Sequence, residues 1–298
     1  MVHKLIETHF APLIVFAIVL GIFFPFFSSF EYLVLFLLAV VIFIASLKVD
    51  FELFFHYLKN FKYLGSRFVL IKLIFPLIVF FVLSFFSPEF ALGGLLLVAV
   101  PSGMLNVVLS DILKGNNELS LAFTVLSHLL SFIYIPLLVF IAIQETVSFD
   151  YVSLSLTLIQ LVLIPVVLAF LVKKFFWNKL EKHSKYFSAL VILFIFLIVA
   201  IIVSVNRNSF LQFQSFIPII IFVVLLMFLL MLSGLFLANN RKDKIAFSLS
   251  AFHINGALGL FLANAYFSQE VILVMVSVQL VVDVFIAFFK WFSDKFIS

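Results

Sequence analysis

The 298-residue sequence contains no cysteine. Disulfide bonds, iron–sulfur clusters and thiolate metal sites are therefore excluded. Charged residues are also scarce, because aspartate, glutamate, lysine and arginine together make up 11% of the chain. A soluble domain of this length needs more charged and polar side chains to cover the surface that faces water. The composition therefore argues against a water-soluble protein.

Apolar side chains are abundant: 66% of the residues are hydrophobic and the mean hydropathy is +1.36. This composition predicts a polytopic membrane protein. The first apolar run, from about His9 to Phe27, is too long for a signal-peptide core and lacks a small-residue cleavage site, so we expect a retained span. The net charge of +4 is better explained by orientation in a membrane than by a nucleic-acid partner.

A helix needs about 20 apolar residues to cross a bilayer. Runs of this length predict an all-α fold of ten transmembrane helices with short loops and no soluble domain. The predicted spans are residues 8–27, 31–48, 63–86, 90–113, 119–143, 151–173, 187–205, 215–238, 244–267 and 270–290. We treat residues 1–298 as a single transmembrane unit, in which residues 1–145 form a first five-helix repeat and residues 146–298 a second.

The positions of the basic residues predict the orientation of these spans. With a cytoplasmic N-terminus, all of the 18 lysines and arginines except Lys72 and Arg207 fall in inner loops or on the inner termini. Lys4 and Lys59 are among those on the inner side. The positive-inside rule therefore places both termini in the cytoplasm, and we expect a multi-pass protein of a bacterial inner membrane.

Polar residues interrupt one predicted helix in each half. The fourth helix breaks at Pro101–Asn106 and the ninth at His253–Gly256. An odd number of helices in each half makes the second half enter the membrane inverted, which is typical of secondary transporters. Two crossed, broken helices would direct half-helix N-termini at one place, which suits an anion. The expected substrate-binding residues there are Pro101, Gly103, Asn106, His253, Asn255 and Gly256.

Three stretches resemble a known family. AVPSGMLN, LKGNNELSLAFTVLS and AFHINGALGLFLANAYF are similar to motifs of the bile acid/sodium symporter family, as are FFPFF and SLKVDFELFF. The resemblance implies a core domain of helices 3–5 and 8–10 and a panel of helices 1, 2, 6 and 7. It implies secondary active transport of a small organic anion by alternating access, with sodium as the coupling ion and no other cofactor.

The same resemblance implies which residues bind the coupling ion. Carried over position by position, Asn106, Ser120, Thr124, Ser127 and Asn255 fall on polar positions of the family, with Na⁺ at Asn106, Thr124 and Ser127. The family's glutamate and glutamine in the ninth helix are replaced here by Ser250 and Ile254. Because sodium favours several oxygen ligands and negative charge, sodium coupling is in doubt and a proton is the alternative coupling ion.

Two charged residues fall near the middle of predicted spans. Lys72 lies four residues before Pro76, near a family glutamine. We hypothesise that its ammonium replaces a bound sodium ion and contacts the substrate anion directly; the alternative is a lysine that snorkels to the cytoplasmic face. Ser250 is kept as an ion-coupling candidate, and Asp283, one turn after Gln279, is another. Asp283 could pair with Lys72 or with His253.

Other functions remain as alternatives. A proton-coupled or uncoupled carrier similar to the auxin efflux carriers shares the predicted architecture. An intramembrane enzyme with a Ser102–His253 dyad is a remote alternative, so we expect no enzyme. The expected partners are a small organic anion and the lipid bilayer, with no nucleic acid and no obligate protein partner. The sequence leaves open the substrate, the coupling stoichiometry, the direction of transport and the oligomeric state.

Overall fold

The computed structural model describes residues 10–50, 52, 54–55, 61–143, 149–210 and 216–297. Within these ranges the chain forms helices, and the only β-type contact is an isolated bridge between Ser102 and Ile254. Lys4, Lys59 and the expected boundary between residues 145 and 146 lie outside the described residues.

The apolar composition is arranged in helices of membrane-crossing length. Within the described residues, six helices are long and apolar enough to cross a bilayer: Pro25–Leu47, Lys62–Ser84, Asn117–Ile143, Tyr151–Val205, Ile217–Phe236 and Gln269–Phe296. Three shorter apolar helices are Pro12–Phe23, Phe90–Ala99 and Gly256–Tyr266. The expectation of an all-helical, polytopic membrane protein is therefore confirmed.

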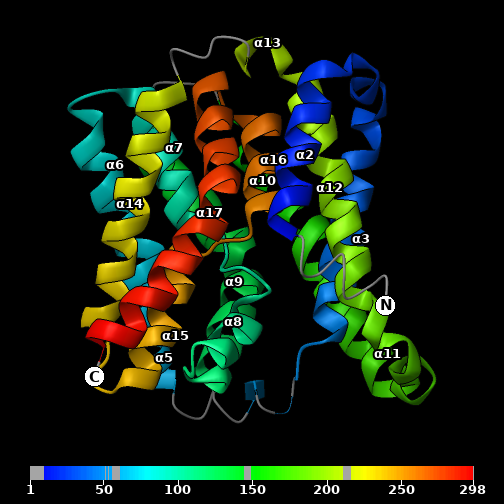
Figure 1. Cartoon of the computed structure of the whole chain (residues 1–298), viewed down its shortest axis with the longest axis vertical. Helices are drawn as coiled ribbons and strands as arrows, with labels where there is room; N and C mark the ends of the chain where they lie inside the picture. Colours follow the sequence, from blue (N-terminus) through cyan, green and yellow to red (C-terminus); the bar gives the residue numbers. More distant parts are fainter. Residues whose placement is uncertain are drawn as a thin grey trace.

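One group of helices packs around α12 and lies on the right of Figure 1. α12 contacts α2, η1 and α3, and α11 also packs on α3. The bounds of this group are α2 (Phe10–Phe23), η1 (Pro25–Leu33), α3 (Val34–Leu47), η5 (Ile159–Leu163), α11 (Ile164–Leu180), η6 (Glu181–Tyr186) and α12 (Phe187–Val205). α10 (Tyr151–Leu158), which leads into η5, packs on α9 instead. The short helix α13 (Arg207–Phe210) lies at the upper end of the molecule.

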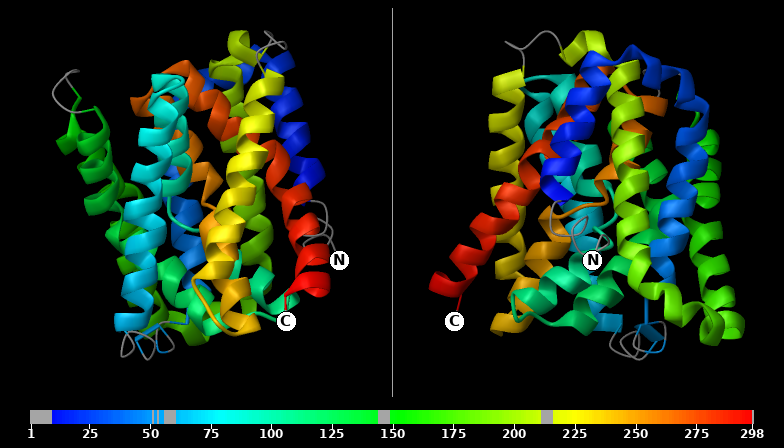
Figure 2. Two further views of the ribbon diagram at one scale, coloured as in Figure 1. Left: turned by 90° about the vertical axis from the view of Figure 1, so that its left-hand side faces the viewer. Right: turned by 45° about the vertical axis from the view of Figure 1, so that its right-hand side comes forward.

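A second group packs around α7, α14 and α17. α6 and α17 contact α7, while α14 contacts α15 and α17. Figures 1 and 2 show α17 running obliquely to the C-terminus near the lower end. The bounds are α5 (Phe61–Val69), η3 (Leu70–Ile74), α6 (Phe75–Ser84), α7 (Pro88–Ala99), α8 (Asn106–Ile112), α9 (Asn117–Ile143), α14 (Phe216–Phe236), α15 (Arg241–Phe252), α16 (Gly256–Tyr266) and α17 (Gln269–Phe296).

Two of the long helices contain a π-turn immediately before a proline. η3 precedes Pro76 and η5 precedes Pro165, and each turn is closed by an amide that bonds to the carbonyl five residues earlier. A proline cannot donate to the carbonyl four residues before it, so the α-helical hydrogen-bond ladder is already interrupted there. The wider π-turn accommodates this interruption and keeps both helices continuous.

One predicted loop is helical instead. The segment expected to leave the membrane after residue 173 continues α11 to Leu180. Lys173 stacks over Trp177 one turn later, with Nζ 4.7 Å from the ring centroid, and its ammonium donates to the Val49 carbonyl at 2.6 Å. These two contacts favour the extra helical turns, because each links the lysine to a neighbour along or beside the helix.

Asp243 joins three elements at the lower end of the second group. Its carboxylate accepts hydrogen bonds from the Tyr63 hydroxyl at 2.9 Å, the Asn116 amide at 2.7 Å and the Asn240 amide at 3.0 Å. Asn240 in turn caps α15 by accepting from the Asp243 backbone amide. A buried carboxylate with this many donors holds α5, the turn between α8 and α9, and α15 in a fixed arrangement.

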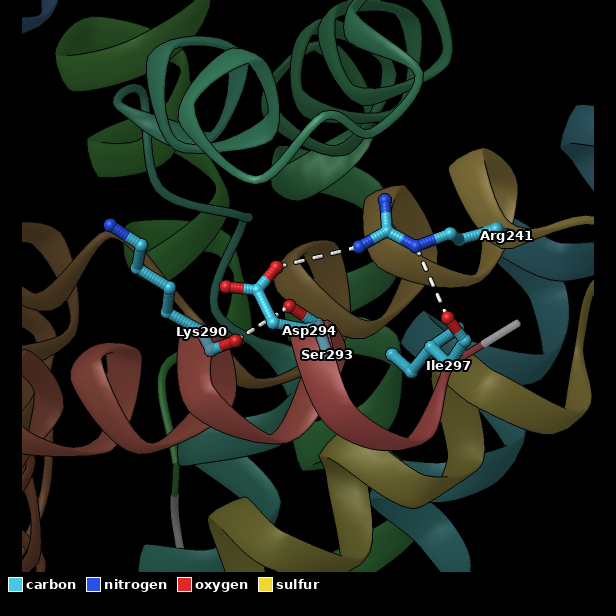
Figure 3. A network of polar contacts seen from close by, with 5 residues as sticks. All are labelled: Arg241, Lys290, Ser293, Asp294 and Ile297. Atoms are coloured by element: carbon cyan, nitrogen blue, oxygen red, sulfur yellow. Dashed lines mark hydrogen bonds and ion pairs between the residues drawn. The ribbon is translucent and has the colours of Figure 1, made fainter.

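The start of α15 is also connected to the end of α17. Arg241 donates through Nε to the Ile297 carbonyl at 3.1 Å, and its guanidinium lies 3.6 Å from the Asp294 carboxylate (Figure 3). The Asp294 side chain is 62% exposed. An ion pair this open to solvent contributes little to stability.

Asp243→Ala should lower the free energy of unfolding by about 2–4 kcal/mol, because it leaves part-buried donors without an acceptor. Asp294→Ala is the matched control, and its loss should stay below about 1 kcal/mol. Reversible unfolding in mixed detergent micelles measures both values. Equal losses for the two variants would contradict the role assigned to Asp243.

Candidate functional site

The two predicted interruptions occur and cross each other inside the helix bundle. α7 ends at Ala99 and α8 begins at Asn106, while α15 ends at Phe252 and α16 begins at Gly256. The extended segments between these helices are bridged in antiparallel fashion. The Gly103 amide donates to the His253 carbonyl at 2.8 Å, and the Asn255 amide donates to the Pro101 carbonyl at 2.7 Å. The two breaks thus satisfy each other's backbone groups.

Asn106 and His253 strengthen this crossing through their side chains. The Asn106 amide nitrogen donates to the His253 carbonyl at 3.3 Å, and the His253 Nδ1 bonds to the Asn106 Oδ1. Asn106 is completely buried and His253 is 8% exposed. Both polar ends of the Asn106 amide are therefore occupied by one partner across the crossing.

Ser102 connects the crossing to two further helices. Its hydroxyl donates to the Ser250 carbonyl on α15 at 2.6 Å, and its backbone amide donates to the Ser127 hydroxyl on α9 at 3.2 Å. Ser127 in turn donates to the Thr124 carbonyl at 2.8 Å. Two predicted site residues, Ser127 on α9 and Ser250 on α15, are thereby bonded to the crossing.

His128 and Asn255 form a second polar contact between α9 and the crossing. The His128 Nδ1 lies 2.9 Å from the Thr124 carbonyl, which can only accept a hydrogen bond, so Nδ1 carries the proton. Nε2 is then the acceptor for the Asn255 amide at 3.1 Å. Asn255 also caps α16 by accepting from the Leu258 amide. Asn255 therefore fixes both α16 and the His128 ring.

A cavity of about 280 Å³ lies beside the crossing. Gly103, Met104 and Leu105 line it just before α8, and Asn255 and Gly256 line it at the start of α16. The N-termini of two helices thus meet the same space. Its remaining wall is formed mainly by apolar residues of α3, α9, α12 and α17.

The charged residues of the cavity gather at one end. Lys48, Asp50 and Glu118 are exposed and line the cavity where α3 ends and α9 begins, so the cavity opens on this side. Lys48 donates to the Ser188 hydroxyl on α12 at 2.5 Å. The sequence did not identify these lining residues, because only the packing of α3, α9 and α12 brings them together.

Gln279 is a further cavity residue whose position could not be inferred. It lines the cavity, and its amide lies so close to Gly256 that a Cβ there would overlap it. Gln279 also lines a separate groove of about 450 Å³ between α2 and α17, together with Asp283. Asp283 lines only this groove, although its neighbour Val282 lines the cavity. It pairs neither with Lys72, whose ammonium binds carbonyls at the end of α7, nor with His253, whose ring bonds to the first side chain of α8.

The predicted site residues fall into three sets, of which the first and third share Thr124. Gly103, Thr124, His253, Asn255 and Gly256 line the cavity, whereas Pro101, Asn106 and Ser127 lie within the hydrogen-bonded crossing. Within the described part of the chain, the buried hydroxyl oxygens of Ser120, Thr124 and Ser250 have no hydrogen-bond partner. Buried hydroxyls normally have partners, so this third set has unused capacity to bind a ligand.

Lys72 does not lie where direct contact with a substrate requires it. It is completely buried, is absent from the cavity lining, and donates to the carbonyls of Val98 and Val100 at 3.0 and 2.7 Å. It therefore neither faces a solute in this cavity nor snorkels to a membrane surface. The reason is local, since the carbonyls at the end of α7 attract the ammonium.

The sequence is similar to known transporters. A profile of the sodium bile acid symporter family matches residues 35–213, which include the first interruption but not the second. A protein of Bacillus subtilis (strain 168), named uncharacterized sodium-dependent transporter YocS, is 30% identical over 182 residues. That alignment covers 60% of this chain and 57% of the relative, so the matched part spans little more than half of the relative's length.

Gly103→Ala should destabilise the crossing by about 1–3 kcal/mol, because the new methyl group would overlap the His253 ring held by Asn106. Gly94→Ala is the matched control. Its Cβ would meet only side-chain atoms of Leu83, Val79 and Phe222, of which the Leu83 and Val79 atoms lie 2.7 and 2.8 Å away. Unfolding in mixed micelles measures both, and an equal or greater loss for the control would contradict the assignment.

Proposed function

Because the chain belongs to the sodium bile acid symporter family, we propose that it is a secondary active transporter of a small organic anion. The observation that carries this proposal is the cavity shared by the N-termini of α8 and α16. A helix N-terminus has partial positive charge and suits an anionic group. The apolar walls of the cavity suit the carbon skeleton of such an anion.

We further propose that the chain consists of two inverted repeats of five transmembrane helices. The antiparallel bridge between Ser102 and Ile254 supports this proposal, since inverted repeats make the two broken helices run in opposite directions. The packing groups around α12 and around α7, α14 and α17 fit a panel and a core that move relative to each other.

The orientation follows from the basic residues. α5, the end of α11 and the start of α15, which carry many of them, lie at the lower end of Figure 1, whereas α13 with Arg207 lies at the upper end. We infer that the lower end is cytoplasmic, together with both termini, in a bacterial inner membrane. The cavity mouth at Lys48, Asp50 and Glu118 is then open to the cytoplasm.

Sodium is the coupling ion that the buried oxygens favour. The hydroxyls of Ser120 and Thr124 on α9 and of Ser250 on α15 are buried neutral oxygens, unpartnered among the described residues, that could bind such an ion. Asn106 and Asn255, also expected to bind the ion, already have hydrogen-bond partners. A site of hydroxyls without a carboxylate binds sodium weakly, so a proton-coupled or uncoupled carrier is the second candidate, with Asp283 as the proton-binding group.

An enzyme is not supported, since members of this family are transporters. The geometry gives a physical reason to set aside a Ser102–His253 dyad. The Ser102 hydroxyl donates to the Ser250 carbonyl and the His253 Nδ1 bonds to Asn106, so neither group activates the other.

A polar cluster links three elements on the side opposite the cavity mouth. Asn206, which follows α12, donates to the Asn264 Oδ1 on α16 at 2.6 Å. Asn264 donates to the Glu31 carboxylate on η1 at 3.3 Å. Asn264 therefore links the core to two panel elements. Alternating access requires these bonds to break when the outer side opens.

Thr124→Val should reduce sodium affinity about tenfold while leaving stability in sodium-free buffer unchanged or higher, because it removes an unpartnered buried oxygen. The measurement is uptake of cholate, pantoate or pyruvate into proteoliposomes with an inward gradient of sodium or of choline chloride. Ser46→Ala, which removes an unpartnered hydroxyl from α3, is the control and should retain sodium dependence. Absence of uptake of every solute tested would count against the transport proposal, and sodium-independent uptake would favour the second candidate.

Asn264→Ala should shift the population toward the outward-open state. The cysteine-free chain allows Met104→Cys to serve as a single thiol probe in the cavity. A membrane-impermeant maleimide applied from outside should label the double variant several-fold faster than Met104→Cys alone. Ser204→Ala, which removes a bond from α12 to the Phe24 carbonyl within the panel, is the matched control. The control also carries Met104→Cys. Equal labelling rates in Met104→Cys alone, with Asn264→Ala and with Ser204→Ala would contradict the role assigned to Asn264.

A further inference from the structure

The last carbonyls of α7 are held by side chains from two other helices. The Lys72 ammonium binds the carbonyls of Val98 and Val100, and the Tyr134 hydroxyl of α9 donates to the Ala99 carbonyl between them at 2.8 Å. Lys72 is completely buried and Tyr134 is 3% exposed. The end of α7 that enters the crossing is thus coordinated by one cation and one hydroxyl.

This end of α7 favours a cation for two reasons. The final carbonyls of a helix have no amide partner within the helix and carry its partial negative charge. Buried in a membrane protein, they cannot turn to bulk water. Converging backbone carbonyls are also the ligands that replace the water shell of a monovalent metal ion.

Lys72 has the features of a bound ion rather than of an ion pair. In the part of the chain that the structure describes, no carboxylate forms a salt bridge with it. Its place in the π-turn η3 directs the side chain to α7 rather than to the cavity. The positive charge is therefore balanced by the carbonyl dipoles of α7.

We propose that Lys72 is a tethered cation that occupies a monovalent-cation site at the C-terminus of α7. The site is distinct from the hydroxyls of Ser120, Thr124 and Ser250 and from the cavity. The end of α7 is thereby bound by a cation that belongs to the chain itself and is not taken from solution. The proposal deepens the proposed function by naming the cation that supports the crossing, but it is tested through stability and not through transport.

The test removes the tethered cation and offers a free one. Lys72→Ala leaves the carbonyls in place and opens space for an ion, whereas Lys72→Met removes the charge but fills the space. Thermal unfolding of each purified variant is measured in choline chloride, KCl and NaCl at equal ionic strength. Lys62→Ala, at an exposed lysine of α5, controls for the change in net charge.

Both Lys72 variants should unfold at a lower temperature than the native protein in choline chloride. NaCl or KCl should raise the unfolding temperature of Lys72→Ala by about 3 °C or more beyond its effect on the native protein. Lys72→Met and Lys62→Ala should respond to these salts as the native protein does. This pattern supports the proposal whether or not any solute is transported.

A response of Lys72→Ala identical to that of the native protein would overturn the proposal. So would an extra response of equal size in Lys72→Met, because that side chain leaves no room for an ion. If Lys72→Ala does not fold, Lys72→Ser decides, because its short side chain leaves nearly the same space and its hydroxyl adds an oxygen ligand beside the two carbonyls; the same gain in cation response is expected. The absence of that gain would also overturn the proposal.

Discussion

Two broken helices inside a membrane protein must find partners for their backbone amides and carbonyls without help from bulk water. The crossing solves this problem by letting each break serve the other. Two backbone hydrogen bonds link Gly103 to His253 and Asn255 to Pro101, and the Asn106 amide adds a third link across the same point. Lys72 and Tyr134 then bind the carbonyls at the end of α7. The polar residues that look out of place in an apolar chain are the ones that make the interruption possible.

The same requirement separates structural residues from residues with spare binding capacity. Asn106, His128 and Asn255 use their polar side-chain atoms to hold the crossing. Thr124 differs, since its hydroxyl is buried and has no partner among the described residues, although the residue lines the cavity. Polar character alone therefore does not identify a ligand site here. The informative observation is a polar atom that the fold leaves unused.

The sequence predicts well those features that depend on local chemistry. The breaks occur where the sequence predicts them, because Pro101, Gly103 and Gly256 weaken the helix beside polar residues. Proline alone does not decide the position of a break, since Pro76, Pro136 and Pro165 lie in continuous helices. Motif resemblance identified the family, as the profile match over residues 35–213 confirms. The division into two five-helix repeats and the roles of individual site residues remain predictions, because neither the family match nor the packing of the helices tests them.

Features that depend on packing could not be predicted. Lys72 was expected to face a solute, but its direction depends on the π-turn that carries it and on the nearby end of α7. Asp243 escaped notice because a carboxylate in a basic loop has no distinctive spacing, although it joins α5, the turn before α9, and α15. The approach of Gln279 to Gly256 likewise depends on how α16 and α17 meet.

The two π-turns also bear on how this fold tolerates insertions and deletions. A π-turn holds one residue more than the α-helical turn it replaces, and each residue of an α-helix turns the chain by about 100°. The segments before and after η3 are therefore out of phase with a uniform helix, as are those on either side of η5. Losing a single residue at either turn would convert it into an ordinary α-helical turn and leave the faces of the flanking segments nearly unchanged, whereas losing one elsewhere in these helices would rotate the half-helix by about 100°.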